Sequence, residues 1–595
     1  MPHEAAHAST SNTSLVPPLP QPARSPTLAV AQFAFVVVCV ATLATLAADL
    51  RRGGRIARRL GRALDSRGAA WGAGAFAFGL VCLVWGSLSE PPVGNDESAY
   101  LLQARIFASG RLAGPPRPLP EFFQQYHVFV EPVLAAKYPP GHSLLLAPGI
   151  WIGLPGFVPA LLVALTAAIL YSVTRRLANG SAALLAVLLL TTSDIALRFD
   201  ASYFSEVTTA ALFAIAWWAL LKYKTFGKQR WLVLWAIAVS WGAVTRPLTM
   251  LAFALPAAVA AISLVVRRRA WADLGPSLAA GLLIVAILPI WNARVAGDWR
   301  TLPQSEYARR YLPSDRLGFG ASVLAPAAPL SPDEERANRV VAQLHAGYSA
   351  AGLPQAAAER AANIIRGTWS YGGTPGIAVL FAAVMLPIAI TRIVIGTSLC
   401  VFGAYLAYAH DPSWTLYYLE LQPALAFLTA IGFFGATQRL SRWVTRRRPG
   451  AAPWASDVHH LAFAASVIWL AAPTPGRIVS YRRAHVEQRE YRAQFERAIA
   501  GLPSTPSIVF LSTAPGHGEQ RLVENVPDLW SEQTWIVHDL GEQNVRLLAL
   551  APARRAYLCR EYARGDTANF RIEPLQGATS SEGSDHRSLI QPIDP

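Results

Sequence analysis

The stretch that decides the fold is FAFGLVCLVWGSLSEPPVGNDESAY, residues 76–100. The apolar run Phe76–Leu88 leads through a short proline-containing segment into the acidic pair Asp96-Glu97. Two carboxylates therefore lie where an apolar helix reaches water. A membrane anchor has no need of paired acids there, whereas an enzyme that removes a proton from a hydroxyl group does. The stretch predicts a catalytic group at the surface of a membrane.

The composition extends this pattern to the whole chain. Of the 595 residues, 53% are hydrophobic and only 15% are charged, whereas soluble proteins carry roughly 25% charged residues. Nearly uncharged stretches recur along most of the chain, and each has about the length that crosses a ~30 Å hydrocarbon core. We expect an all-α polytopic membrane protein with about twelve transmembrane helices.

The basic residues give these spans an orientation. The net charge of +15 is concentrated in short clusters between apolar runs, namely Arg51–Arg67, Arg175-Arg176, Lys222–Arg230, Arg267–Arg269 and Arg446–Arg448. Cytoplasmic loops carry such clusters, and an alternating path puts all of them on one side. Nucleic-acid binding is not expected, because no basic stripe is interleaved with aromatic residues. The alanine- and arginine-rich composition is typical of a bacterium with GC-rich DNA, which predicts the inner (plasma) membrane.

The same path divides the chain. We expect a disordered tail (1–27), an added N-terminal span with a basic loop (28–70), a transmembrane module (71–473) with outer loops 89–155 and 292–374, a small α/β extracytoplasmic domain (474–575) and a disordered tail (576–595). The apolar segment His142–Ile152 is too short to span and is predicted to be half-inserted on the outer face. Helices are expected at 333–344 and 355–366, and strands at 507–511, 534–537 and 554–558.

The acidic pair has a structural alternative. Asn95 would cap a helix from about Ser98 to Ser109, and acids in a first turn favour the helix dipole by ~0.3–1 kcal/mol each. Other polar groups on the same predicted face favour a functional site. The segment Lys137–His142 (KYPPGH) closes the first outer loop. Its lysine is either an ordinary interfacial cation or a contact for the phosphate of a lipid-linked substrate.

Two more segments fall on this face. The turn 198–206 (RFDASYFSE) brings Asp200 and Glu206 there, although Glu206 also fits as the start of a helix. The segment Thr245-Arg246-Pro247 places an arginine between two apolar spans with no acid beside it in sequence. Ionisable groups at such positions are costly and often mark a pathway or site. An ordinary interfacial arginine is the competing interpretation.

Together these segments resemble the membrane glycosyltransferases of the GT-C fold, in particular the protein O-mannosyltransferase and aminoarabinose-transferase-like group of bacterial enzymes. The resemblance covers roughly residues 70–440 and rests on Asn95-Asp96-Glu97, on Tyr138–His142, on Thr245-Arg246-Pro247 and on the alternation of spans with outer loops. It departs in a late outer loop, where family members often carry an Arg-Tyr pair before a proline. Residues 414–423 read WTLYYLELQP, with tyrosines, including Tyr418, but no arginine.

The resemblance implies a sugar donor carried on a polyprenyl phosphate and a glycan, lipid or protein acceptor outside the cytoplasm. It makes Asp96 the general base and Glu97 a neighbour that shapes the site, and we hypothesise a single inverting displacement. The expected substrate-binding residues are Lys137, Tyr138, His142, Asp200, Glu206, Arg246 and Tyr418. No cofactor is certain from the sequence, and a divalent metal (Mg or Mn) is left open.

Two other classes of protein stay open at this point. A secondary transporter would also have about twelve spans, but its acids or broken helices would be expected near the midplane. A non-catalytic assembly protein of the envelope would use the outer loops and tail for binding, and it would tolerate substitution of Asp96 and Glu97. The sequence identifies neither the sugar nor the acceptor, and it assigns no task to the tail.

Overall fold

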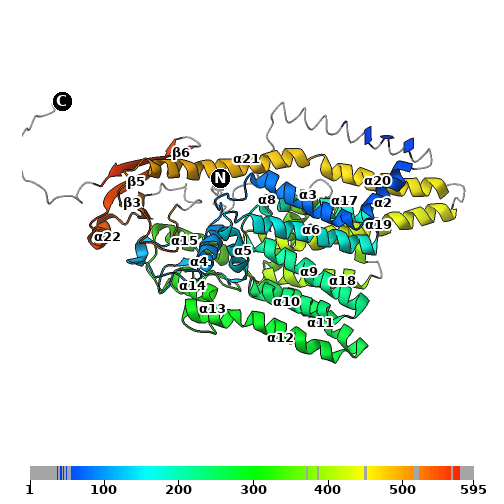
Figure 1. Ribbon diagram of the computed structural model, residues 1–595, viewed down its shortest axis with the longest axis horizontal. Coiled ribbons are helices and arrows are strands. Elements are labelled where there is room, and N and C mark those ends of the chain that lie inside the picture. The colour runs from blue at the N-terminus through cyan, green and yellow to red at the C-terminus, as the bar shows by residue number, and fades with distance from the viewer. Residues whose placement is uncertain are drawn as a thin grey trace, which may run out of the picture.

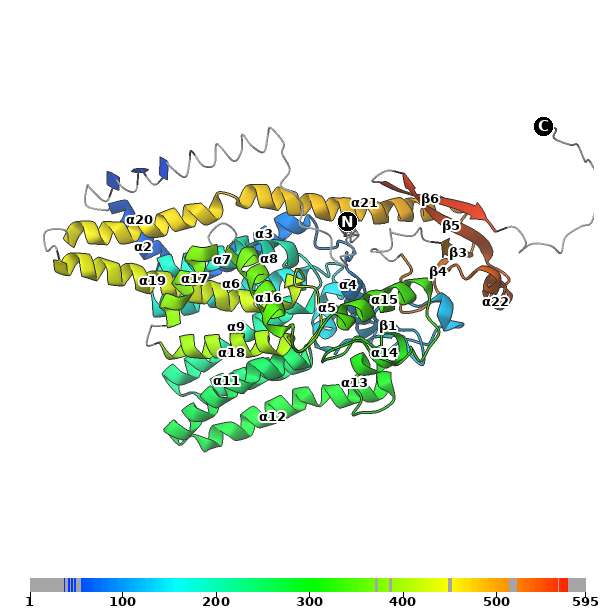
Figure 2. The same cartoon turned by 180° about the vertical axis from the view of Figure 1, so that it is seen from behind.

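The structure of the protein is a computed structural model that describes residues 55–369, 373–384, 388–447, 452–512, 522–564 and 567–575, with scattered positions between 37 and 49. The predicted tails 1–27 and 576–595, and most of the predicted span 28–48, lie outside these residues. Figures 1 and 2 show an elongated molecule in which a bundle of roughly parallel helices occupies one end and a small sheet the other.

The helical bundle contains the predicted spans. Its helices are α3 (Gly68–Trp85), α6 (Phe157–Leu177), α7 (Gly180–Thr192), α8 (Asp194–Phe199), α9 (Ser205–Phe226), α10 (Gln229–Ala243), α11 (Pro247–Arg268), α12 (Leu274–Val285), α13 (Ile287–Ala296), α17 (Gly373–Val384), α18 (Ala389–Tyr405), α19 (Gln422–Arg447) and α20 (Ala452–Ala471). The spans expected within residues 71–473 fall on these helices. Two short helices, α7 with α8 and α12 with α13, follow each other where a single span was expected. Within the described residues, six helices are long and apolar enough to cross a membrane, fewer than the spans expected, and α7 and α18 are shorter apolar helices.

Small residues let the bundle helices approach closely. A Cβ at Gly74 of α3 would lie 3.0 Å from the carbonyl oxygen of Ala164 in α6, so only glycine allows this contact without a shift. Membrane helices use small residues at their interfaces because lipid supplies no hydrophobic drive for helix association. The two helices therefore form a close pair, and α3 leads directly from it into the acidic segment.

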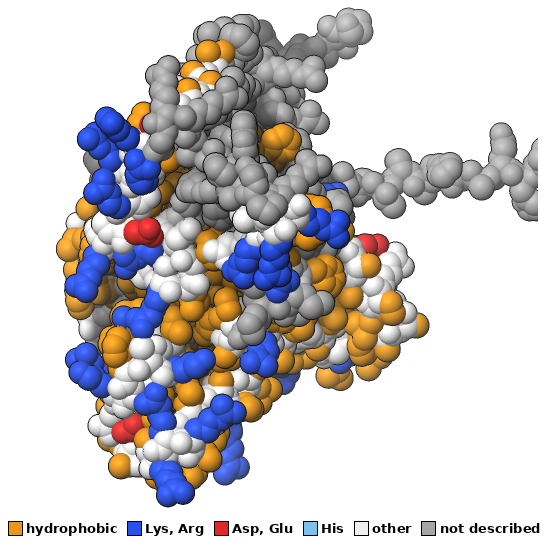
Figure 3. Space-filling view, turned by 90° about the vertical axis from the view of Figure 1, so that its right-hand side faces the viewer, with side chains coloured by type: hydrophobic (Ala, Val, Ile, Leu, Met, Phe, Trp, Pro, Cys, Tyr) orange, Lys and Arg blue, Asp and Glu red, His pale blue; other side chains and the backbone are white. Residues whose placement is uncertain are grey.

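Several bundle helices end in basic residues at the same end of the molecule. These residues are Arg175 and Arg176 of α6, Lys224 of α9, Arg267 and Arg268 of α11, and Arg446 and Arg447 of α19. Figure 3 views this end, which lies on the right in Figure 1, and shows many Lys and Arg side chains with few acidic ones. We call it the basic end. The basic helix α2 (Arg55–Leu64) adds to it and contacts α7.

The opposite end of the bundle, here the loop end, holds the segments between the spans. They form α4 (Asn95–Ala108), β1 (Val128–Phe129), β2 (Ala135–Ala136), α5 (Gly141–Trp151), α14 (Pro303–Tyr311), α15 (Pro332–Ala346) and α16 (Leu353–Trp369). α15 and α16 match the two helices expected in this loop, whereas α14 was not predicted. The segment expected to be half-inserted is α5, which packs against α4.

The C-terminal region departs from a simple small domain. The long helix α21 (Thr474–Ala500) runs from the bundle to a sheet made of β3 (Ser507–Ser512), β4 (Thr534–His538), β5 (Arg555–Arg564) and β6 (Thr567–Pro574), with α22 (Asn544–Leu550) beside it. The strand order is β4-β3-β5-β6, with β3 parallel to both neighbours and β6 antiparallel to β5. β3 reads SIVFLS and is buried almost throughout, as expected of a central parallel strand. The three expected strands are present, and β6 was missed. We call β3–β6 with α22 the C-terminal domain.

Candidate active site

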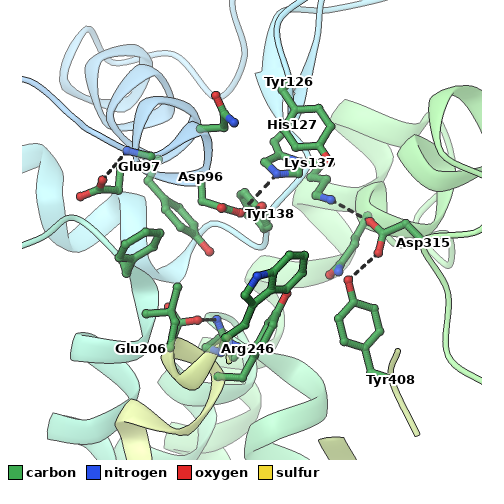
Figure 4. A pocket seen from close by; sticks show the side chains of 18 of the residues that line it. Asp96, Glu97, Tyr126, His127, Lys137, Tyr138, Glu206, Arg246, Asp315 and Tyr408 are labelled. Atoms are coloured by element: carbon green, nitrogen blue, oxygen red, sulfur yellow. Dashed lines mark hydrogen bonds and ion pairs between the residues drawn. The ribbon is translucent and has the colours of Figure 1, made fainter. Parts of the chain in front are cut away.

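A cavity of about 1520 Å³ opens at the loop end, where the bundle meets α4, the β1–β2 hairpin and α14. Its lining includes most of the residues singled out in the sequence, namely Asp96, Glu97, Lys137, Tyr138, Glu206 and Arg246. Figure 4 shows how these side chains come from separate elements and meet around one space. Segments far apart in the sequence thus converge at the end of the apolar helices.

Asp96 lies in the first turn of α4 and keeps 40% of its side chain exposed. Its Oδ1 accepts a hydrogen bond from the Tyr138 hydroxyl and lies 3.4 Å from Nε2 of His127. Tyr138 is held in turn by stacking on Tyr100, with ring centroids 4.5 Å apart. The carboxylate is therefore oriented on one side by neighbouring side chains and open on the other. That combination suits a group that must accept a proton from a substrate.

Glu97 has a different environment from its neighbour. Its side chain turns back to accept the backbone N–H groups of Val93 (3.1 Å) and Gly94 (2.6 Å) through Oε2, and that of Tyr203 (2.8 Å) through Oε1. Burial raises the pKa of Glu97 to about 7, against the opposing effect of these hydrogen bonds. The expected cap at Asn95 was wrong, because α4 starts at Asn95 and Gly94 is its N-cap residue. Glu97 satisfies this helix start and ties it to the 200–204 turn.

Lys137 forms a buried ion pair that the sequence did not reveal. Its Nζ lies 3.0 Å from Oδ2 of Asp315, and the two side chains are only 4% and 7% exposed. The other carboxylate oxygen of Asp315 accepts the Tyr408 hydroxyl at 2.7 Å. Burial alone would raise the pKa of Asp315. The Lys137 ammonium and the Tyr408 hydroxyl outweigh this effect and bring that pKa below its ordinary value. The ion pair thus fixes the Lys137 side chain at the cavity wall.

Arg246 is the second cation of the cavity, and it lies between two acids. Its Nη1 is 2.6 Å from Oε1 of Glu206, and its Nε is 3.6 Å from Oε2 of Glu420. Nη2 donates to the Tyr405 hydroxyl at 2.5 Å, which donates in turn to Glu420 at 3.1 Å. Buried charges need such partners, because desolvation otherwise costs several kcal/mol per ion. The absence of an adjacent acid in sequence was therefore misleading.

The remaining candidates do not line this cavity. His142 is fully buried, with its ring nitrogens 2.8 Å from Thr208 Oγ1 and 2.7 Å from the carbonyl oxygen of Tyr203. Asp200 lines a separate small pocket inside the bundle. The Tyr418 hydroxyl lies 3.1 Å from Nε2 of His410, whereas the neighbouring Tyr417 faces the cavity. These three residues, predicted to bind substrate, lie outside the cavity lining.

Sequence reasoning missed His127, Asp315 and Glu420. Glu420 lies in the stretch 414–423 that had already been singled out for its lack of arginine, so its carboxylate was a signal that could have been used. Asp315 follows no recognisable motif. His127 has a backbone φ of 67°, which only the folded chain shows. Within the described residues, no group of three or more His, Cys, Asp and Glu side chains is placed to hold a metal ion.

A family model and solved structures indicate the class of protein that the chain resembles. Residues 155–292 match the family model described as dolichyl-phosphate-mannose-protein mannosyltransferase. The helical bundle with its loop-end cavity is the fold of the GT-C membrane glycosyltransferases. Family match and fold together support a membrane glycosyltransferase of the GT-C type. The resemblance expected from the sequence is thereby confirmed.

Particular proteins of similar fold are found among the solved structures. ArnT from Cupriavidus metallidurans, in the structure bound to undecaprenyl phosphate, superposes with a TM-score of 0.52 at 14% sequence identity, covering 85% of this chain and 98% of that one. The apo structure of the same protein gives a TM-score of 0.50 with the same identity and coverage. The arabinosyltransferase EmbB from Mycobacterium smegmatis has a TM-score of 0.43 at 14% identity, over 80% of this chain and 47% of that one. No curated protein matches the chain in sequence.

Proposed function

We propose that the protein transfers a sugar from a polyprenyl-phosphate donor to a hydroxyl group of an extracytoplasmic acceptor, with inversion at the anomeric carbon. The observation that supports this most directly is the shared cavity, in which Asp96 faces the same space as Lys137 and Arg246. A proton acceptor and two cations around one cavity at the end of apolar helices suit a sugar–phosphate linkage presented by a lipid. The undecaprenyl phosphate in the ArnT structure supports a donor of this chemical class.

The reaction would proceed as one displacement. The acceptor oxygen attacks the anomeric carbon while its proton passes to the carboxylate of Asp96. The bond between the anomeric carbon and the phosphate oxygen breaks, and its electron pair leaves with the polyprenyl phosphate. The hydrogen bond from Tyr138 fixes the orientation of Asp96 while leaving it open to the cavity. A base positioned in this way contributes typically ~10²–10⁴-fold to the rate.

The cations would stabilise the departing phosphate. Negative charge grows on that group in the transition state, and preorganised positive groups lower the barrier most when water is excluded. The Lys137 ammonium has three N–H donors, of which Asp315 accepts one, so it retains capacity for a phosphate oxygen. Arg246 lies at the N-terminus of α11 and is fixed by Glu206. We assign the phosphate contact to Lys137 and the shaping of the cavity floor to Arg246.

The lipid tail would enter beside an apolar loop. Leu317 and Leu324 line the cavity and are 51% and 68% exposed, and Phe319 between them is 40% exposed. Leu248 of α11 continues this apolar border. Exposed apolar groups at a cavity mouth are unfavourable in water but favourable against lipid. The border therefore gives a polyprenyl chain an apolar route toward the cations.

The test is Asp96→Asn, assayed with radiolabelled polyprenyl-phosphate sugars and purified protein. We expect transfer to fall by ~10²–10⁴-fold, with unchanged accumulation in the membrane. Asp273→Asn is a matched control, because Asp273 also accepts a tyrosine hydroxyl, that of Tyr223 at 2.8 Å, but at the basic end. Normal transfer in Asp96→Asn would remove Asp96 from its proposed role. Equal losses of transfer in Asp96→Asn and Asp273→Asn would show that the loss reflects a less stable protein.

A further inference from the structure

The elements that carry Asp96 and His127 both contact the C-terminal domain. Asp96 lies on α4, and His127 directly precedes β1. These two side chains are 3.4 Å apart, although they are separated by a loop. Their mutual placement therefore depends on whatever holds α4 and the segment 122–129 together.

Asn525 of the C-terminal domain binds the chain before His127 through its backbone N–H and both polar groups of its side chain. Its backbone N–H donates to Gln125 Oε1 at 2.7 Å, and its Nδ2 donates to the carbonyl oxygen of Phe123 at 2.8 Å. Its Oδ1 accepts from Nε of Arg117 at 2.8 Å. Asn525 is only 6% exposed, so these bonds form in a buried interface. A buried polar side chain with every group satisfied favours a single arrangement of its partners.

The neighbouring residue contacts α4. Glu524 Oε1 accepts the hydroxyl of Ser98 at 2.7 Å, one turn away from the start of the helix. Arg492 of α21 holds the same carboxylate with two N–H groups at 2.9 and 2.7 Å. Charge-assisted, two-point pairs of this kind fix geometry as well as adding stability. Glu524 thus contacts α4, which bears Asp96, and the adjacent Asn525 contacts the segment that bears His127.

The apolar core continues across the same interface. One buried cluster joins Ala99, Leu102 and Ile106 of α4 to Ile508, Phe510, Trp535 and Val537 of the sheet. Phe122 and Phe123 pack edge-on against Phe510 and Trp535, with ring centroids 6.3 and 5.9 Å apart. A face buried in this way is not available to bind an acceptor. It instead makes the sheet part of the scaffold around the cavity.

α14 and the loop before α15 hold the segment from the opposite side. The backbone N–H of His127 donates to the hydroxyl of Tyr307 at 2.8 Å. The side chain of Gln124 contacts the carbonyl oxygen of Pro329 at 2.6 Å and the backbone N–H of Ser331. The positive φ of His127 is uncommon for a residue with a side chain. Such a conformation persists where the surroundings fix it.

We infer that the C-terminal domain is a positioning element of the active site, in which Asn525 and Glu524 set the distance between Asp96 and His127. This inference rests on the proposed function for its assay. Asn525 touches no reacting atom, so it is a positioning residue rather than a catalytic one. Its removal should loosen the segment 122–129 while the rest of the C-terminal domain keeps its fold.

The experiment compares Asn525→Ala with Asn544→Ala in the full-length protein. Asn544 is a matched control, because it is also buried and hydrogen-bonded, but only within the domain, to Leu540 and Asp539. We expect Asn525→Ala to lower kcat on the order of tenfold to a hundredfold, the usual consequence of misplacing a catalytic group by about 1 Å, with little change in donor KM. Hydrogen–deuterium exchange should rise across residues 122–130 in this variant alone.

Each outcome decides the inference. A wild-type kcat in Asn525→Ala, or an equal loss in Asn544→Ala, overturns it. If Asn525→Ala does not accumulate, Ser98→Ala provides the second variant, because it removes only the contact with Glu524. A kcat loss smaller than that expected for Asn525→Ala, with unchanged donor KM, then supports the inference. A wild-type kcat in Ser98→Ala overturns it. If the wild-type protein transfers no sugar from a polyprenyl phosphate, the proposed function fails. Wild-type transfer beside a fully active Asn525→Ala overturns this inference alone.

Discussion

The Lys137–Asp315 pair allows stability and catalysis to be separated in one experiment. The charges are 3.0 Å apart and almost fully buried. With an effective dielectric constant of ~20, their attraction amounts to about 5 kcal/mol. Removing one partner leaves the other charge buried and uncompensated, which typically costs ~3–5 kcal/mol. We therefore expect Lys137→Met to lower the free energy of unfolding by about that amount.

A second substitution should restore stability without restoring activity. In Lys137→Met/Asp315→Asn the buried charge is gone, and the new amide oxygen can still accept the hydroxyl of Tyr408, now 2.7 Å from Asp315. The double variant should recover roughly half or more of the lost stability, because replacing a buried ion pair by neutral groups is often close to neutral. Sugar transfer should stay lost in both variants, since neither has the cation assigned to the phosphate.

The assay combines thermal unfolding in detergent, followed by tryptophan fluorescence, with transfer from a labelled polyprenyl-phosphate sugar. Transfer by the stable double variant would show that Lys137 does not contact the phosphate. Wild-type stability of Lys137→Met would refute the buried pair. The stability of the protein and its transfer activity can thus change independently in these variants.

Three further outcomes are expected. The pKa of Asp315 lies below its ordinary value of 3.8. The stability that this shift contributes is therefore complete above pH 3.8 and is lost as the pH falls through the lower pKa of the folded state. Melting temperatures measured against pH should show this loss in the wild type and not in Lys137→Met/Asp315→Asn. A Cβ at Gly141 would lie 2.5 Å from Thr245 Oγ1 and 2.8 Å from the carbonyl oxygen of Val244, so Gly141→Ala should cost ~1–3 kcal/mol in unfolding, whereas Gly79→Ala, with nothing within 4 Å, should not. Tyr138→Phe removes a hydrogen bond to a charged carboxylate and should lower transfer by roughly ten- to a hundredfold, while Tyr171→Phe, whose hydroxyl binds the carbonyl oxygen of Leu64, should transfer normally.

Much of the fold could be predicted because it follows from composition and charge. Apolar runs of membrane length and basic clusters between them define the helices and the basic end before any contact is known. The same alternation placed Asp96, Lys137, Glu206 and Arg246 at one end of the bundle, where they meet. The departures are local. α14 begins with a proline and is rich in charged residues, so its sequence shows no helical periodicity of apolar residues. β6 lacks the continuous apolar run that marks β3.

The site was harder to predict, because its pairs join distant parts of the chain. Lys137 and Asp315 are 178 positions apart, and no local pattern links them. Sharing a face also does not settle where a side chain points. Asp200 and His142 lie on segments that reach the cavity, yet both side chains turn into the packed interior. Sequence spacing gave the location of the site, whereas the ion pairs within it required tertiary structure.

The division of labour between the two neighbouring acids sets the order in which they must occur. Glutamate at 97 has the extra methylene that lets its carboxylate curl back onto Gly94, a reach that aspartate lacks, while the shorter side chain at 96 stays beside Tyr138. A chain with the two residues exchanged would keep its charge and composition. It would lose the hydrogen bonds at the start of α4 and would place a longer acidic side chain beside Tyr138. Searches for relatives of this protein should accordingly treat Asp-Glu and Glu-Asp as different motifs.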